Sequence, residues 1–171
     1  MTLPSNAHLL AFGRIIHQYG LCEVGVKITV SAILRLDIAR TLVVLQPSSA
    51  TDLKNVAKSL AKMTLDPKWS EVFCCIVGDW SAHNALRNLI AHSAWADGDR
   101  PGSIKPRNLS IREGRAKFAG DGEDEASYTA DELEAAAKSL AFINKRNLQF
   151  LEDSGLRRII DEKIDAESAE K

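Results

Sequence analysis

Residues 69–95 read WSEVFCCIVGDWSAHNALRNLIAHSAW and form a long segment with helical apolar spacing near the middle of the chain. Its large apolar residues recur at intervals of three and four, the spacing that places side chains on one face of a helix. That face is made by Val72, Phe73, Ile76, Val77 and Trp80. The pattern predicts a single helix over residues 69–94, with this apolar face packed into a core.

The second half of the same stretch breaks the apolar pattern. The positions that would continue the core-facing stripe are His83, Asn84, Arg87 and Ala91, and three of the four are polar. Two ladders at four-residue spacing follow from the same helix: Asn84, Asn88 and His92 on one flank, and Asp79, His83 and Arg87 beside them. A polar break of this kind is expected at functional sites and at interfaces between chains. The alternative interpretation is a helix end that rises out of the core, where Arg87 and His92 are ordinary surface groups.

The run Arg87-Asn88-Leu-Ile-Ala-His92 resembles the signature of the HEPN superfamily, the higher eukaryote and prokaryote nucleotide-binding domains. That signature is an arginine, commonly followed by a polar residue such as Asn, and then a histidine after a gap of four to six. The tripeptide Ala-His-Ser before Trp95 is also similar to bacterial members. The resemblance implies a helical domain whose motif helices meet in a homodimer and form a composite ribonuclease site. It also implies that Arg87 and His92 are catalytic and that Asn88 orients His92.

The residues themselves are compatible with that chemistry. A histidine can take or give a proton near neutral pH. An arginine can hold a phosphate through two hydrogen bonds. The sequence has no His-Glu-x-x-His motif, no glycine-rich phosphate loop and no Gly-x-Ser-x-Gly elbow. We therefore expect RNA cleavage that uses neither a metal nor a cofactor, with the 2′-hydroxyl of the RNA as nucleophile.

The rest of the chain predicts further helices and a single domain over residues 1–171, because this length suits one core. Apolar periodicity predicts either one helix over 5–36 or two helices broken near Gly20. A second helix is expected over 52–63, capped by Ser49 or Thr51, with Lys54, Lys58 and Lys62 on a solvated face. The capping box Thr129-Ala-Asp-Glu132 predicts a helix to about residue 153, and a shorter helix is expected over 156–168. The predicted fold is mostly α, an up-and-down helical bundle.

A small β-hairpin is expected as an insertion after the motif helix, at about residues 103–120, on either side of the turn Arg112-Glu-Gly-Arg115. Between residues 100 and 117 there are six basic residues and one acid. They make this the most basic segment of a chain whose net charge is only −1. We expect its basic side chains to bind RNA, and the alternative is an exposed hairpin that uses charge for solubility. The RNA-binding candidates are Lys105, Arg107, Arg112, Arg115 and Lys117.

The N-terminal residues, the apolar runs and the cysteines indicate in which cellular compartment to expect the protein. The first residues lack the basic and apolar regions of a signal peptide, and no apolar run is long enough to span a bilayer. Of the three cysteines, Cys74 and Cys75 lie in the apolar half of the central stretch and are predicted to be buried thiols. We expect a cytoplasmic protein with no membrane partner.

Three functional interpretations remain open. The first is a HEPN-type endoribonuclease acting as a toxin or defence component, with a cognate antitoxin as an expected partner. The second is a HEPN-like bundle that binds nucleotide, RNA or a protein without cleaving. The third is a helical interaction protein in which the motif is coincidental, and the near-zero net charge favours it.

Overall fold

The computed structural model describes residues 4–45, 48–112, 115–119 and 126–169, with side chains at all of these except 38, 108–112, 115–119 and 166–169. The described residues form seven helices and four strands, so the mostly α prediction is confirmed. Contacts divide the chain into two compact units. Unit 1 comprises residues 1–18 and 83–139, and unit 2 comprises residues 19–82 and 140–171.

Helix α1 (Asn6–Leu34) contributes its first part to unit 1 and its second part to unit 2. It is one uninterrupted helix, which decides between the two alternatives left open at Gly20. Gly20 lies in the helix with nothing within 4 Å of the position that a Cβ would take. A glycine in a helix interior costs only about 0.5–1 kcal/mol relative to alanine, which a long packed helix tolerates.

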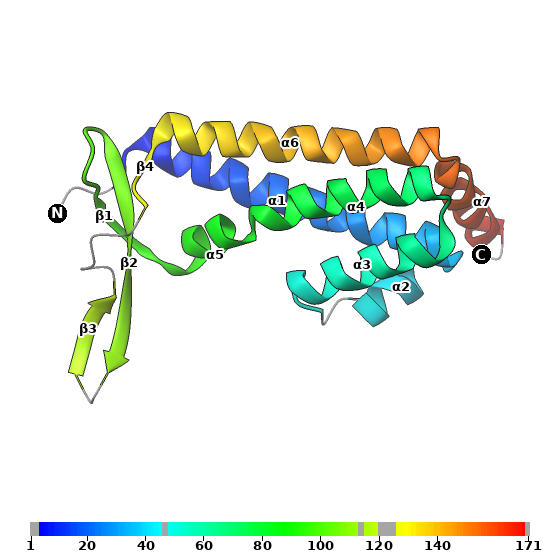
Figure 1. The fold of residues 1–171 in the computed structure, drawn as a ribbon, viewed down its shortest axis with the longest axis horizontal. Helices are drawn as coiled ribbons and strands as arrows, with labels where there is room; N and C mark the ends of the chain where they lie inside the picture. The colour runs from blue at the N-terminus through cyan, green and yellow to red at the C-terminus, as the bar shows by residue number, and fades with distance from the viewer. Residues whose placement is uncertain (1–3, 46–47, 113–114, 120–125, 170–171) are drawn as a thin grey trace. The chain divides into compact units, whose positions relative to one another are not determined.

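Unit 2 is a helical bundle. It contains the second part of α1, then α2 (Ile38–Leu45), α3 (Ala50–Thr64), α4 (Pro67–Ala82), the second part of α6 (Ala130–Asp153) and α7 (Leu156–Ala169). Figure 1 labels these helices along the chain. The start of α3 is fixed by Ser49, whose hydroxyl accepts from the Asp52 N–H while the Asp52 carboxylate accepts from the Ser49 N–H. This reciprocal capping satisfies two backbone donors that the helix leaves unpaired.

The core of unit 2 is built around aromatic side chains. Four of the five residues predicted for the apolar face of α4 are buried, and Val72 is half-buried. The Trp80 ring of this face lies 5.4 Å from the Tyr19 ring of α1. Phe73 stacks on Phe150 of α6 at 5.2 Å. Such pairs add about 0.5–1.5 kcal/mol beyond the area that they bury. They tie α4 to both α1 and α6.

A polar cluster lies inside this core. The Thr29 hydroxyl is within 3.0 Å of the Gly25 carbonyl oxygen and 3.2 Å of the Asn147 Oδ1. Gly25 permits this approach, since a Cβ there would stand 2.9 Å from the Asn147 Nδ2. The Cys22 thiol donates to the Leu140 carbonyl at 3.2 Å, and burial raises the pKa of this thiol to about 11. The cluster fixes how α1 and the second part of α6 pack in unit 2.

Unit 1 joins the first part of α1, helix α5 (Asn84–His92), a small antiparallel sheet and the first part of α6. Strand β2 (Ser103–Arg112) pairs with β1 (Ala94–Asp97), with β3 (Arg115–Ala119) and with β4 (Tyr128–Thr129). The hairpin β2–β3, visible in Figure 1, confirms the predicted insertion. Strands β1 and β4 were not predicted.

The N-terminus of α6 is stabilised by hydrogen bonds and an ion pair of the Glu132 carboxylate. The Glu132 carboxylate accepts from the Thr129 N–H at 2.8 Å, which completes the predicted capping box with the Glu132 N–H on the Thr129 hydroxyl at 3.2 Å. Arg100, from the turn before β2, binds the same carboxylate through two nitrogens, at 2.8 and 2.7 Å. The Arg100 guanidinium and the Thr129 N–H lower the pKa of Glu132 to about 2. One carboxylate therefore joins the sheet to the helix.

Candidate functional site

Helix α5 carries the three residues of the Arg-Asn-x3-His motif. It is nine residues long, and none of its residues is buried. Its first intrahelical bond runs from the Arg87 N–H to the His83 carbonyl at 3.0 Å, and the Ser93 N–H closes it on the Leu89 carbonyl at 3.0 Å. The motif thus lies on a short helix that presents its side chains at or near the surface.

The prediction of one helix over residues 69–94 is wrong. Helix α4 ends at Ala82, His83 stands between the two helices with φ −84° and ψ −3°, and Ala94 already belongs to strand β1. The ladder of Asp79, His83 and Arg87 was drawn on a continuous helix and is therefore broken at His83. In unit 2, Asp79 binds Arg146 of α6 at 2.6 Å.

The second ladder is preserved, because Asn84, Asn88 and His92 all belong to α5. Asn88 and His92 are exposed and Arg87 is half-buried. The Arg87 Nη1 donates to the Asn88 Oδ1 at 3.0 Å. The resemblance implied that Asn88 orients His92, whereas in the structure the side-chain Oδ1 of Asn88 accepts from Arg87. Asn88 is therefore placed to position the arginine.

The end of α5 is anchored through Trp95. Its ring lies 4.8 Å from the Phe12 ring of α1 and 6.2 Å from the Tyr128 ring of β4. Strand β1 is also held by pairing with β2, in which Trp95 stands opposite Pro106. His92 lies three residues before this anchor. The helix that carries the motif is thereby fixed at its C-terminal end, although its own residues bury little surface.

Two basic side chains of the segment over residues 100–117 form ion pairs within the chain. Lys105 binds Asp99 at 2.7 Å, and Arg100 binds Glu132. Arg107 is half-buried in β2 and pairs with Ala94 of β1. Ala94 follows His92 by two residues in the sequence. The side chains of Arg112, Arg115 and Lys117 lie outside the described residues. The RNA-binding role of the hairpin stays a prediction, with Arg107 as the described member nearest along the sheet to the motif.

No metal-binding group of three His, Cys, Asp or Glu side chains is found among the described residues. Within the same residues, no helix is both long and apolar enough to cross a membrane. What α5 offers chemically is an imidazole that can exchange a proton and a guanidinium that can bind a phosphate oxygen pair.

Sequence reasoning missed a pocket formed by α3 and α4. The prediction of a solvated face treated three lysines alike, yet Lys58 and Lys62 line this pocket and Lys54 does not. Cys74 and Cys75, predicted to be buried, are half-buried and exposed and lie on the same pocket. The signal that was available is Gly78, a residue without a side chain within the apolar pattern of α4.

No protein-family model, curated protein or solved structure matches this chain.

Proposed function

We propose that this chain is a metal-independent endoribonuclease of HEPN type, with Arg87 and His92 as its catalytic residues and Asn88 as a positioning residue. The observation that carries the proposal is the presentation of all three side chains by one helix in which no residue is buried. Because no residue of α5 is buried, this helix can contact a large substrate or a second copy of the chain.

The reaction follows from the two side chains. The 2′-hydroxyl of a ribose attacks the adjacent phosphorus, the bond to the 5′-oxygen breaks, and the products are a 2′,3′-cyclic phosphate and a 5′-hydroxyl. His92 takes the 2′-hydroxyl proton and then gives a proton to the leaving 5′-oxygen. Arg87 binds the non-bridging oxygens, where negative charge increases in the transition state. No metal or cofactor takes part.

A second copy of the chain completes the site in this proposal. Arg87 and His92 are five residues apart, which on an ideal helix is about 140° of rotation. Within one copy the two side chains therefore diverge from the α5 axis. Across a two-fold axis the α5 helices of two protomers would bring the arginine of one copy toward the histidine of the other. We accordingly propose a homodimer through α5.

The test of this function is the chemistry of its products. A mixed RNA pool is incubated with the protein in excess EDTA, and the new 3′ ends are examined for a 2′,3′-cyclic phosphate. The matched control uses one RNA sequence that is cleaved in the pool, made once with ribose and once with 2′-deoxyribose at the cleaved position, which removes the nucleophile. We expect cleavage of the first and none of the second; cleavage of both would overturn the mechanism.

A further inference from the structure

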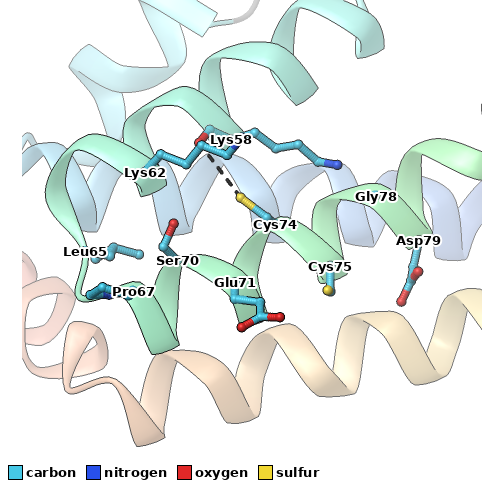
Figure 2. A pocket seen from close by; sticks show the side chains of 10 residues that line it. All are labelled: Lys58, Lys62, Leu65, Pro67, Ser70, Glu71, Cys74, Cys75, Gly78 and Asp79. Carbon is cyan, nitrogen blue, oxygen red and sulfur yellow. Dashed lines mark hydrogen bonds between the residues drawn. The ribbon is translucent and has the colours of Figure 1, made fainter.

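The pocket of α3 and α4 has a volume of about 630 Å³ and belongs entirely to unit 2 (Figure 2). This volume lies within the range of sites that hold small organic molecules, roughly 300–1,000 Å³. Helix α3 contributes two lysines, the connection to α4 contributes Leu65, and the remaining lining comes from α4. The lining residues are Lys58, Lys62, Leu65, Pro67, Ser70, Glu71, Cys74, Cys75, Gly78 and Asp79.

One wall of the pocket is basic. Lys58 and Lys62 are four residues apart on α3, so they project from the same face. Among the described side chains, neither ammonium group has a carboxylate within 4.0 Å. Lys58 is half-buried and reaches across toward α4, as Figure 2 shows. Two lysines on one face of α3 without a carboxylate partner favour an anionic ligand.

Gly78 makes room for one of these cations. A Cβ at position 78 would stand 3.2 Å from the Lys58 Nζ and 3.9 Å from its Cε. The glycine is not explained by backbone conformation, because it lies inside a regular helix, where glycine is unfavourable by about 1 kcal/mol relative to alanine. Its absent side chain allows the Lys58 ammonium to lie against α4 beside the pocket.

The remaining surfaces are largely apolar. Leu65 and Pro67 form one end, as seen in Figure 2. Cys74 is half-buried with its Sγ 3.9 Å from the Lys58 carbonyl oxygen, and such a thiol packs as a small apolar group. This end can cover the hydrocarbon part of a ligand whose charged group contacts the lysines.

The acidic residues set the charge of the ligand. Asp79 is bound by Arg146 at 2.6 Å, so its charge is compensated. Glu71 is exposed on the rim with no basic side chain within 4.0 Å among the described residues. Two ammonium groups and one such carboxylate leave the pocket with a charge of about +1. A singly charged anion matches that balance better than a doubly charged phosphate.

We propose that this pocket binds a small organic monoanion, such as a carboxylate or sulfonate, that carries an apolar body. The anionic group contacts the Lys58 and Lys62 ammonium groups, and the body lies against Leu65, Pro67 and Cys74. This site is separate from helix α5 in sequence and in unit, and the proposal does not depend on ribonuclease activity.

The experiment compares two probes with the same ring system in the full chain. One is 8-anilinonaphthalene-1-sulfonate, a monoanion, and the other is N-phenyl-1-naphthylamine, its uncharged counterpart. Binding is followed by fluorescence titration. We expect saturable one-to-one binding of the sulfonate, and an affinity about tenfold lower in the double variant Lys58→Ala/Lys62→Ala, since charge-assisted hydrogen bonds are lost. The affinity of the uncharged probe should not change in that variant.

Two further variants make the test specific. Lys54→Ala removes a lysine one turn earlier on α3 that does not line the pocket, and it should leave sulfonate binding unchanged. Glu71→Gln removes the unpaired carboxylate and should strengthen sulfonate binding several-fold without changing binding of the uncharged probe. Equal sulfonate affinity in all three variants, or the same loss in Lys54→Ala as in the double variant, would overturn the proposal.

Discussion

The Arg87 guanidinium donates a hydrogen bond from Nη1 to the Asn88 Oδ1 at 3.0 Å, between neighbouring residues on α5. Consecutive residues on a helix point about 100° apart, so this contact requires the arginine to bend back along the helix surface. The amide therefore restricts where the guanidinium can lie. A restricted guanidinium binds a phosphate with less loss of conformational entropy than a free one.

We predict that Asn88→Ala lowers the single-turnover rate of RNA cleavage about tenfold. The loss arises because Arg87 is no longer positioned, while Asn88 is exposed and its removal should change the free energy of unfolding by less than about 0.5 kcal/mol. Asn55→Ala, at an exposed position on α3, is the control and should leave the rate unchanged. A wild-type rate in Asn88→Ala would show that the Arg87–Asn88 contact has no part in the reaction.

A second prediction concerns the hairpin. Replacing Arg107, Arg112 and Arg115 with Ser should weaken RNA binding and flatten its salt dependence. Each phosphate contact on a single strand contributes about 0.7 to the slope of log affinity against log salt, so three contacts contribute about 2. Filter binding at several salt concentrations measures the slope. The control replaces Lys145, Arg157 and Arg158, which changes net charge equally but lies in unit 2; equal slopes for the two triple variants would contradict a specific role for the hairpin.

A third prediction uses the lowered pKa of Glu132, about 2 in the folded protein against an ordinary value of 4.5. A carboxyl whose folded pKa is depressed stabilises the fold above its unfolded pKa, and this contribution disappears as pH falls through the folded value. Glu132→Gln should therefore be less stable than the wild type at pH 7, and the difference should shrink between about pH 4.5 and 2. Denaturant unfolding of both proteins across that range measures it. A difference that stays constant with pH would mean that the Arg100–Glu132 pair contributes nothing through ionisation.

A fourth prediction compares two glycines of α1. Gly25→Ala would bring a Cβ to 2.9 Å from the buried Asn147 Nδ2, so it should destabilise the fold by about 1–3 kcal/mol. Gly20→Ala meets nothing within 4 Å and should be neutral or stabilising by up to about 1 kcal/mol. Chemical denaturation of both variants gives the two free energies. Equal effects would show that the Gly25–Asn147 contact does not constrain the core.

Much of the fold could be predicted because its signals are local. The capping box at Thr129 and Glu132 uses residues three apart, and the structure contains both of its hydrogen bonds. The end of α6 near residue 153 was also predicted, and Gly155 follows it with a φ of 74°, a conformation that favours glycine. The apolar spacing of α4 predicted the buried face that the structure contains.

The break at His83 and strand β1 depended on distant residues. Neither proline nor glycine marks the break, and the helical pattern continues through it. Strand β1 is four residues long and exists because Ala94–Asp97 pair with residues 104–107. The pocket was missed for a similar reason, since Lys58 and Gly78 are brought together only by the packing of α3 on α4. Local periodicity carries no information about such pairings.

The proposed cleavage of RNA depends on His92, so the decisive measurement is single-turnover cleavage of RNA in excess EDTA by the wild type and by His92→Ala. His17→Ala, at another exposed histidine, on α1, is the matched control. We predict a loss of about 100- to 10,000-fold for His92→Ala, the range for removal of a general acid or base, and an unchanged rate for His17→Ala. Cleavage that requires added metal, or that proceeds at the wild-type rate without His92, would contradict metal-independent catalysis by His92.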